Sequence, residues 1–371
     1  MQKIQQDALE VIGRLNERTH LEQVNEKNGT VVKIHKGYAS MHLFVIEKFV
    51  SDIEVGRKGG FHEYTTRYAK VRKIDELYFG KRYYSMLNHW LEQYSQRFRY
   101  SQRVEVFYAV CEELELIGEA PFCFGNPDEL VCVGGVRYMD VFDELIERIR
   151  ERCRSPEFKE QARLRLLNTK KNERNLLARE NAMFSAETGR SRWLILSLTL
   201  GYKPGFRRRI TPETIQEHRN RFFAARRFNK LMSGIENYAW AIEQGEDAGL
   251  HLHVILFYSP DHNHDAFIAQ QIGEYWGDVV TDGKGSYWNS NASERKSGYA
   301  THGHGIGVGQ INRGDTKKRQ ALKINLLYLA KAQQYLMIRC SEHIRTIGMG
   351  KRPKKKKSGR PRADSACVIT S

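Results

Sequence analysis

The chain has 371 residues, of which 40% are hydrophobic and 11% aromatic, so it can bury one large core or two smaller ones and is not disordered as a whole. Lysine and arginine number 60 against 44 aspartate and glutamate, which gives a formal net charge of +16 at pH 7. This charge favours nucleic acid as the partner, with a merely basic or ribosome-associated protein as the alternative.

The six cysteines form no CxxC pair and are too sparse for a secreted disulfide scaffold, which favours a reducing compartment. The first residues, MQKIQQDALEVIGRL, lack a basic segment followed by an apolar core, and no stretch approaches about 18 apolar residues. We therefore expect a cytoplasmic protein without a membrane segment.

Residues 1–185 are predicted to be mainly helical, with an accessory role in DNA binding left open. The helical spacing is clearest around residues 142–149, although a strand is an alternative for Arg103 to Cys111. Between Tyr64 and Arg103, aromatic and basic residues interleave; they either stack on bases or, as we favour, form core and surface. The charged run from Pro156 to Asn181 predicts a long connecting helix.

Residues 186–347 are predicted to form an α+β domain. Trp193 to Leu200 alternates as a central strand, with leucines on one face and Ser197 and Thr199 on the other. Thr211 is a candidate N-cap before Pro212, and a basic helix should continue to Met232. The segments 238–243 and 250–258, joined by the turn GEDAG, predict a hairpin, and 324–340 predicts a helix.

Residues 348–371 are strongly basic and low in complexity, which predicts a disordered tail that attracts phosphates. Gly359-Arg360-Pro361-Arg362 is similar to the core of an AT-hook, which lies in the minor groove of A·T-rich DNA. The predicted DNA-binding residues of this tail are Lys351, Arg352, Lys354, Lys355, Lys356, Lys357, Arg360 and Arg362.

His251 and His253 are the strongest candidates for metal ligands. They are two residues apart on a predicted strand, so both imidazoles point to one side, and apolar neighbours indicate that the strand is interior. A shared ion would satisfy two imidazoles that otherwise compete for hydrogen-bond partners in a core. The other His-x-His pairs, 262/264 and 302/304, lie in polar or glycine-rich loops, where solvation is the expectation.

Glu243 is the candidate third ligand, because the hairpin turn brings it across the ladder from His251. The alternative for Glu243 is a solvated carboxylate at a strand end. Two nitrogens and one carboxylate leave positions open for substrate oxygens, which suits Mg²⁺ or Mn²⁺.

Tyr328 and Lys331 are three apart and share one face of the predicted helix. A phenol is a weak nucleophile at its usual pKa near 10, so nearby positive charge must stabilise the phenolate or the phosphate that it attacks. Tyr328 is therefore a candidate nucleophile and Lys331 its partner, whereas Tyr335, two turns further on, is interpreted as packing.

The chain carries the strand WLILSLTL, then Glu243, then HLHVILF and finally YLAK. With these motifs in this order, it resembles the His-hydrophobic-His (HUH) replication endonucleases. Within them it is similar to the inovirus gene II replication proteins and the YagK/YfjJ-type proteins of prophages and phage satellites. The resemblance covers roughly residues 190 to 340 and implies a central antiparallel sheet flanked by helices. It implies that His251 and His253 bind a divalent metal and that Tyr328 cuts single-stranded DNA.

Under this resemblance the product is a 5′-phosphotyrosine and a free 3′-hydroxyl that primes rolling-circle replication. The implied partners are a single-stranded or hairpin origin and the helicase and polymerase of a bacterial host, with no nucleotide cofactor. Conjugative relaxases place their tyrosine before the histidines, so the order here favours replication. The alternatives are a DNA-binding regulator that keeps this fold without cutting and, less favoured, a structural metal protein that binds RNA.

Overall fold

The structure is a computed structural model that describes residues 21–25, 31–35, 41–56, 59–66, 71–96, 98–118, 122–131, 135–245, 249–301, 305–331, 336–338 and 345–353. Within these residues, no helix combines the length and the apolar composition needed to cross a membrane. The described chain is α+β, with a largely antiparallel main sheet flanked by helices.

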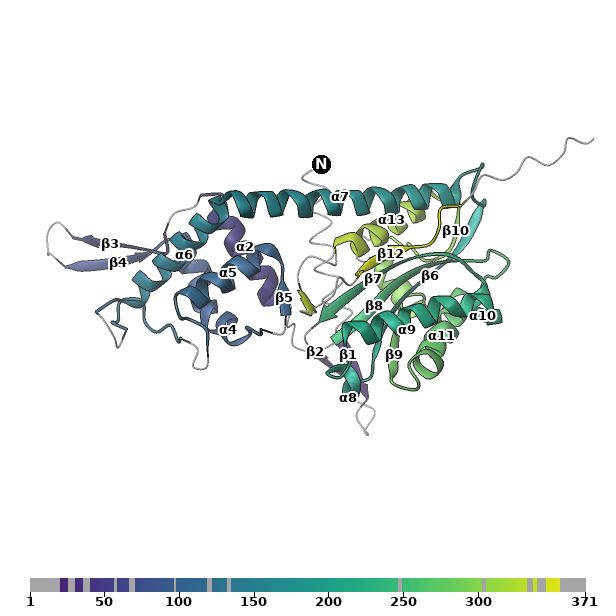
Figure 1. The fold of residues 1–371 in the computed structure, drawn as a ribbon, viewed down its shortest axis with the longest axis horizontal. Coiled ribbons are helices and arrows are strands. Elements are labelled where there is room, and N and C mark those ends of the chain that lie inside the picture. Colours follow the sequence, from purple (N-terminus) through teal and green to yellow (C-terminus); the bar gives the residue numbers. More distant parts are fainter. Residues whose placement is uncertain are drawn as a thin grey trace, which may run out of the picture.

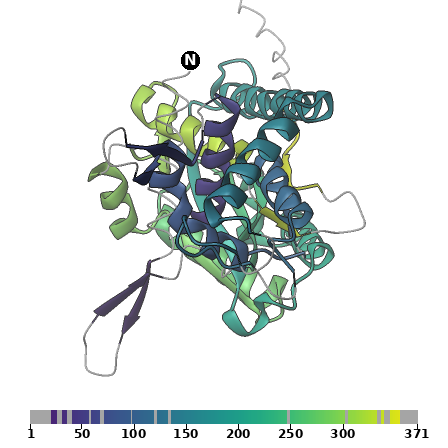
Figure 2. The ribbon, with the colours of Figure 1, turned by 90° about the vertical axis from the view of Figure 1, so that its left-hand side faces the viewer.

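Before the long helix α7, the described residues form two hairpins, one short strand and several helices. Figure 2 shows that the first hairpin, β1–β2, stands apart from the helices. The elements in order are β1 (Leu21–Asn25), β2 (Val31–His35), α2 (Met41–Glu54), β3 (Phe61–Thr65), β4 (Arg72–Glu76), α3 (Tyr78–Tyr83), the 3-10 turn η1 (Tyr84–Met86), α4 (Leu87–Glu92), β5 (Phe98–Tyr100), α5 (Gln102–Glu113) and α6 (Tyr138–Arg154).

The remainder of the chain alternates strands and helices. Its elements in order are α7 (Pro156–Phe184), β6 (Arg192–Tyr202), α8 (Pro204–Arg207), α9 (Pro212–Ala224), the 3-10 turn η2 (Ala225–Arg227), α10 (Lys230–Ser233), β7 (Ile235–Gly245), β8 (Gly249–Tyr258), α11 (Asp265–Tyr275), the π-helical turn η3 (Trp276–Val280), β9 (Gly285–Asn289), α12 (Ser293–Thr301), β10 (Gly309–Asn312), α13 (Thr316–Lys331), β11 (Leu336–Ile338) and β12 (Ile347–Met349).

Helix α7 joins two bodies, one built from α2–α6 and one built around the main sheet (Figure 1). It packs against α5 and α6 near its start and against α13 further on. Glu180 of α7 is fully buried and pairs with Arg319 of α13 at 2.8 Å, with Lys323 3.7 Å away. Because a buried carboxylate is tolerated only when it is paired, this contact fixes α13, the helix that carries Tyr328.

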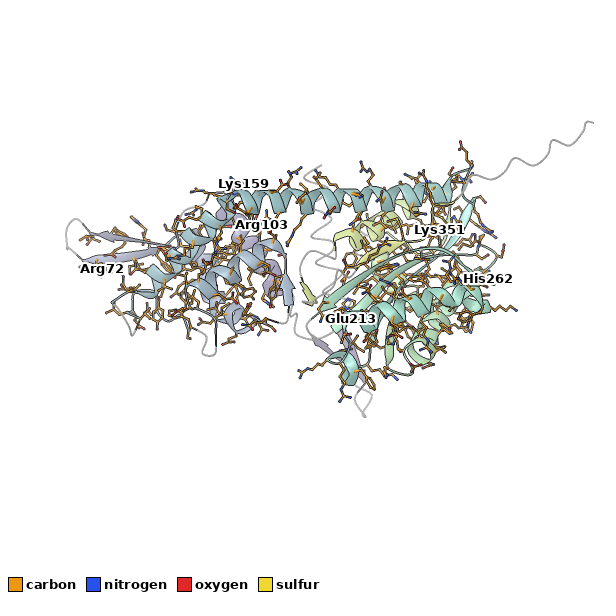
Figure 3. All side chains as sticks on the ribbon, in the orientation of Figure 1. Arg72, Arg103, Lys159, Glu213, His262 and Lys351 are labelled. Carbon is orange, nitrogen blue, oxygen red and sulfur yellow. The ribbon has the colours of Figure 1, made fainter. Side chains whose placement is uncertain are left out.

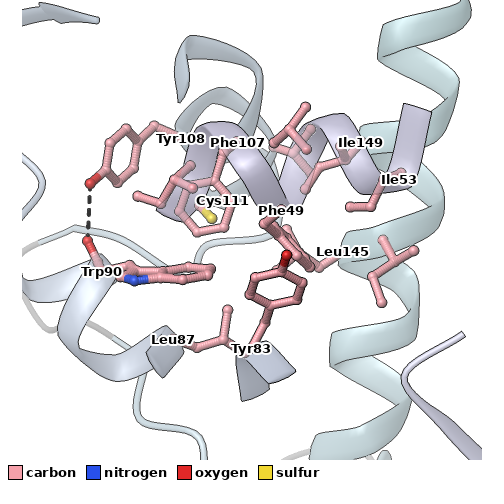
Figure 4. Close-up of a cluster of buried hydrophobic side chains, with 14 of the residues drawn as sticks. Phe49, Ile53, Tyr83, Leu87, Trp90, Phe107, Tyr108, Cys111, Leu145 and Ile149 are labelled. Carbon is pink, nitrogen blue, oxygen red and sulfur yellow. Dashed lines mark hydrogen bonds between the residues drawn. The ribbon is translucent and has the colours of Figure 1, made fainter. Parts of the chain in front are cut away.

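The first body has its own aromatic core (Figure 4). The α6 face predicted from spacing is confirmed, since Phe142, Leu145, Ile146 and Ile149 are fully buried. Several of the interleaved aromatics also belong to this core, as Tyr83 and Tyr100 are almost completely buried. The hydroxyl groups of Tyr78 and Tyr83 both donate to Asp52, so these rings are structural.

The main sheet has the strand order β10–β6–β8–β7–β12, with β9 paired to the second half of β6, and every pairing is antiparallel. Because side chains alternate along a strand, the sheet has two faces with separate cores. Leu194 and Trp240 belong to the face packed with residues of α9 and α11, whereas Ile195 and Ala241 belong to the face packed with residues of α7 and α13.

Several local predictions for this part are confirmed. The strand around Trp193 to Leu200 is β6, the hairpin is β7–β8, and α7 spans the predicted connecting helix. Thr211 caps α9 by accepting a hydrogen bond from the Thr214 amide, and Pro212 follows at the first helical position. The basic helix, however, ends at Ala224 rather than Met232, because Phe228 leaves the helical conformation and Asn229 caps a new turn.

The strand considered as an alternative for one segment is excluded, and the bounds predicted for one helix are wrong. The segment Arg103–Cys111 is helical in α5, where Ser101 caps the helix and the residues at positions 104, 107, 108 and 111 form its buried face. The helix predicted for 324–340 begins earlier, at Thr316, and its described part ends at Lys331. Residues 336–338 instead pair with β5, a contact between distant segments that local periodicity cannot reveal.

The chain also remains ordered beyond residue 347, where a disordered tail was predicted. Residues 347–349 add strand β12 to the edge of β7, and the Gly350 amide donates to the Tyr238 carbonyl. The carbonyl of Lys351 accepts a hydrogen bond from the Asn237 side chain. Pairing with an open sheet edge explains this order, and residues 354–371, including the other basic tail residues and the AT-hook-like segment, lie outside the described residues.

Candidate metal centre

The hairpin β7–β8 brings the three predicted ligands together on the sheet face that packs with α13. Glu243 lies directly opposite His251 in the register, and His253 lies opposite Ala241. The side chains of Glu243, His251 and His253 form a group whose ligand atoms all lie within 4.8 Å of one another. This geometry confirms that the three residues could hold one metal ion.

Both imidazoles direct Nε2 toward the same carboxylate oxygen. Nε2 of His253 lies 3.1 Å from Oε2 of Glu243, and Nε2 of His251 lies 3.6 Å from it. Ligands about 2.1 Å from one ion are separated by roughly 3–3.5 Å, so small movements would suffice to close a coordination shell. The donor set therefore fits a divalent cation with positions left open for oxygen ligands.

The second nitrogen of each imidazole is held by the surrounding strands. Nδ1 of His251 lies 3.0 Å from the Gly249 carbonyl oxygen, which can only accept a hydrogen bond, so Nδ1 donates and the neutral ring keeps its lone pair on Nε2. Gly249 adopts a φ of +64°, which disfavours other residues. Nδ1 of His253 is 2.9 Å from Oγ1 of Thr199 on β6.

The Glu243 side chain is largely buried, with 15% of its surface exposed, and burial alone would raise its carboxyl pKa. In their protonated forms the neighbouring His253 and His251 outweigh burial and lower the pKa of Glu243 to about 2, so the group is a carboxylate at neutral pH. Oε1 of Glu243 and Nε2 of His253 are buried, and neither has a hydrogen bond of good geometry among the described residues, although Nε2 lies 3.1 Å from Oε2. Buried polar atoms of this kind are normally satisfied, and a cation contacting both would satisfy them together.

Tyr328 reaches this centre from α13. Its hydroxyl lies 3.5 Å from Oε2 of Glu243, at the outer limit of a hydrogen bond, and its ring is edge-on to His253 with centroids 5.7 Å apart. Lys331 is in the last described turn of α13, but its side chain lies outside the described residues, as does Tyr335. The structure thus brings Tyr328 together with all three candidate ligands.

The other His-x-His pairs differ from this one. His262 and His264 are exposed in the loop before α11, as expected, and His302 and His304 lie outside the described residues. Sequence analysis did not assign a role to Thr199. The available signal was that Thr199, like Ser197, is a polar residue within an apolar strand; the register of β6 and β8 brings Thr199 opposite His253.

Substitution of Thr199 by valine tests whether this hydrogen bond orients a ligand. Valine keeps the shape of the side chain but removes the oxygen, so we expect metal affinity to fall about 10- to 100-fold with a small change in stability. Calorimetric titration with Mn²⁺ measures this, and Thr199→Ser, which keeps the hydroxyl, is the control. Equal affinity in wild type and Thr199→Val would mean that Thr199 does not support the centre.

Comparisons of the chain with protein-family models, with curated proteins and with solved structures find no match.

Proposed function

We propose that this chain is a rolling-circle replication initiator of the HUH endonuclease type, encoded by a prophage or phage satellite, that nicks and rejoins single-stranded DNA. The proposal combines the sequence resemblance with one observation. A tyrosine hydroxyl lies 3.5 Å from a carboxylate that two histidines also contact, on a strongly basic chain. A nucleophile beside a metal-ligand set is the minimal arrangement for metal-assisted phosphoryl transfer.

The residues have distinct roles in this reaction. Glu243, His251 and His253 would hold a divalent cation, which when bound polarises a phosphate oxygen and stabilises the charge that develops on it. Tyr328 supplies the attacking oxygen from a helix fixed by the buried Glu180–Arg319 pair. Edge-on contact with His253 restricts the ring, which keeps the hydroxyl beside the ligand set.

The covalent step balances without an external energy source. The phenolic oxygen of Tyr328 forms a bond to phosphorus while the bond from phosphorus to the 3′-oxygen breaks. The phenol releases one proton, and the leaving 3′-oxygen takes up one proton to become the 3′-hydroxyl. The product is a phosphotyrosyl ester at the 5′ end. Because one phosphoester replaces another, attack by the 3′-hydroxyl reverses the step and rejoins the strand.

A cleavage assay tests this function. Labelled single strands that together cover the replication region of the encoding element are incubated with the protein and Mn²⁺, and the products are separated under denaturing conditions. We expect one site-specific cut that chelation by EDTA prevents. Binding without any cut would instead favour a DNA-binding regulator that keeps the fold without cutting.

Deletion of residues 354–371 tests the proposed role of the basic tail. This truncation leaves β12 and the hydrogen bonds of Gly350 and Lys351 in place. We expect weaker binding to single-stranded DNA and a salt dependence that is shallower by about 0.7 for each phosphate that the tail neutralises in the full chain. An unchanged slope of log affinity against log salt would show that the tail does not bind DNA.

A further inference from the structure

Two adjoining cavities, of about 650 and 510 Å³, flank the edge strand β12. The larger is lined by residues of α9 and by Tyr238 and Trp240, which belong to the sheet face opposite the metal centre. The smaller is lined by residues of α7 and by Ile347, which belongs to the face of the metal centre. Arg345 and Lys351 line both cavities, so the two form one continuous surface around the sheet edge.

This surface, which we call the β12 edge surface, is strongly cationic. Glu236 lines the larger cavity, but it pairs with Arg190 at 2.6 Å. Within the described part of the chain, no salt bridge joins the cations of this surface to a carboxylate. These cations are Arg179, Arg219, Arg226, Arg227, Arg345, Lys351 and Arg352.

Aromatic rings and backbone carbonyls hold the inner arginines in place. The guanidinium of Arg219 lies 4.3 Å from the centroid of the Trp240 ring and donates to the Arg345 carbonyl. Arg226 lies 5.1 Å from the centroid of the Tyr238 ring, and Phe223 is stacked on the same ring. Cation–π contacts of this kind position a charge without neutralising it.

The charges on this surface disfavour one another. The pKa of Arg219 is lowered mainly by burial and next by the charge of Arg345. The pKa of Arg179 is lowered mainly by burial and next by the charge of Arg352. Nη1 of Arg179 is also buried without a hydrogen-bond partner among the described residues. Bound anions would relieve both the repulsion and the missing hydrogen bond.

The β12 edge surface begins beside the metal centre. The Ile242 amide donates to the Thr346 carbonyl at 2.7 Å, which continues the antiparallel pairing of β7 and β12 by one residue. Arg345 is the next residue of this pairing and lies opposite Glu243. The surface continues to Lys351, labelled in Figure 3, where the chain leads into the basic run 354–357. A DNA strand cut by Tyr328 would therefore meet cations all along this surface.

We propose that the β12 edge surface binds the phosphodiester backbone of a single DNA strand that runs to or from the metal centre. The assignment of that strand as the one being cut rests on the proposed function. Trp240 is almost fully buried, and the half-buried Tyr238 ring already contacts Phe223 and Arg226, so these rings offer little surface for stacking on bases. The surface therefore contacts phosphates and has little preference for base sequence.

Neutralising three exposed cations of the surface tests this proposal. In Arg227→Ala/Arg345→Ala/Lys351→Ala, we expect affinity for single strands of about 20 nucleotides to fall at least tenfold at about 0.1 M salt, and the salt slope to decrease by about 2. Fluorescence anisotropy measures binding in EDTA and in a Tyr328→Phe background, so no cleavage is needed. Mixed-sequence, oligo-dT and oligo-dA strands should give similar results.

The matched control is Lys73→Ala/Lys81→Ala/Lys159→Ala, which removes the same charge from exposed positions of β4, α3 and the first turn of α7. Thermal melts establish that both triple variants are folded. An equal loss of affinity in both would mean that only net charge matters and would overturn the proposal, as would a clear preference for duplex DNA. Because binding is measured without cleavage, a protein that does not nick DNA can still pass this test, and one that nicks can fail it.

Discussion

Replacement of Tyr328 by phenylalanine is expected to reduce strand cleavage by about 10³-fold or more while leaving the free energy of unfolding within about 1 kcal/mol of wild type. The substitution removes the only atom that can bond to phosphorus but keeps the ring, which packs against the core shared by α7 and α13. Cleavage assays with Mn²⁺ and urea denaturation measure the two quantities separately.

The control for this variant is Tyr275→Phe. Tyr275 is half-buried on α11 and packs against the opposite face of the sheet, so losing its hydroxyl should change neither cleavage nor stability appreciably. If Tyr328→Phe cuts DNA at the wild-type rate, Tyr328 is a packing residue and the nucleophile lies elsewhere.

Removal of a candidate metal ligand is expected to weaken Mn²⁺ binding by at least about 100-fold and to abolish cleavage. Loss of a residue that merely hydrogen-bonds a metal ligand already lowers metal affinity by up to about 100-fold, and loss of the ligand itself should cost at least as much. His253→Ala and Glu243→Gln are the most direct variants, because Nε2 of His253 lies closer to Oε2 of Glu243 than Nε2 of His251 does. Calorimetry measures affinity. At a concentration of 100 times Kd, the metal should stabilise wild type by about 2.7 kcal/mol but not the variants.

The exposed pair His262 and His264 provides the matched control, since it has the same spacing outside the sheet. The double substitution of these two residues by alanine should leave metal affinity and cleavage unchanged. Binding to single-stranded DNA in EDTA should survive in every ligand variant, because phosphates are contacted by dispersed cations. A ligand variant that binds Mn²⁺ as well as the control does would remove the basis for the metal centre.

The candidate ligands could be identified from the sequence because they depend on local order. Alternation along 250–258 and the short turn fix the register of the hairpin, and the register alone brings Glu243 opposite His251. The orientation of the imidazoles could not be predicted in this way, since it depends on Thr199 from another strand and on the positive φ of Gly249.

Predictions failed where contacts between distant segments decide the structure. The helix expected through residue 340 gives way to β11, which pairs with β5 more than 200 residues earlier in the chain. The buried face of α13, formed by Leu322, Leu326 and Leu329, likewise depends on packing against α7 and the sheet. The β12 edge surface was missed for the same reason: Arg179, Arg219 and Arg345 come from separate elements.

The measurement that tests the central proposal most directly is the mapping of a covalent adduct. Wild-type protein is incubated with Mn²⁺ and the labelled single strand that it cuts, denatured, digested and analysed by mass spectrometry. We predict a denaturant-resistant adduct in which the 5′-phosphate is attached to Tyr328, and no adduct in Tyr328→Phe. A cut without an adduct, or an adduct on any other residue, would contradict the assignment of Tyr328 as the nucleophile.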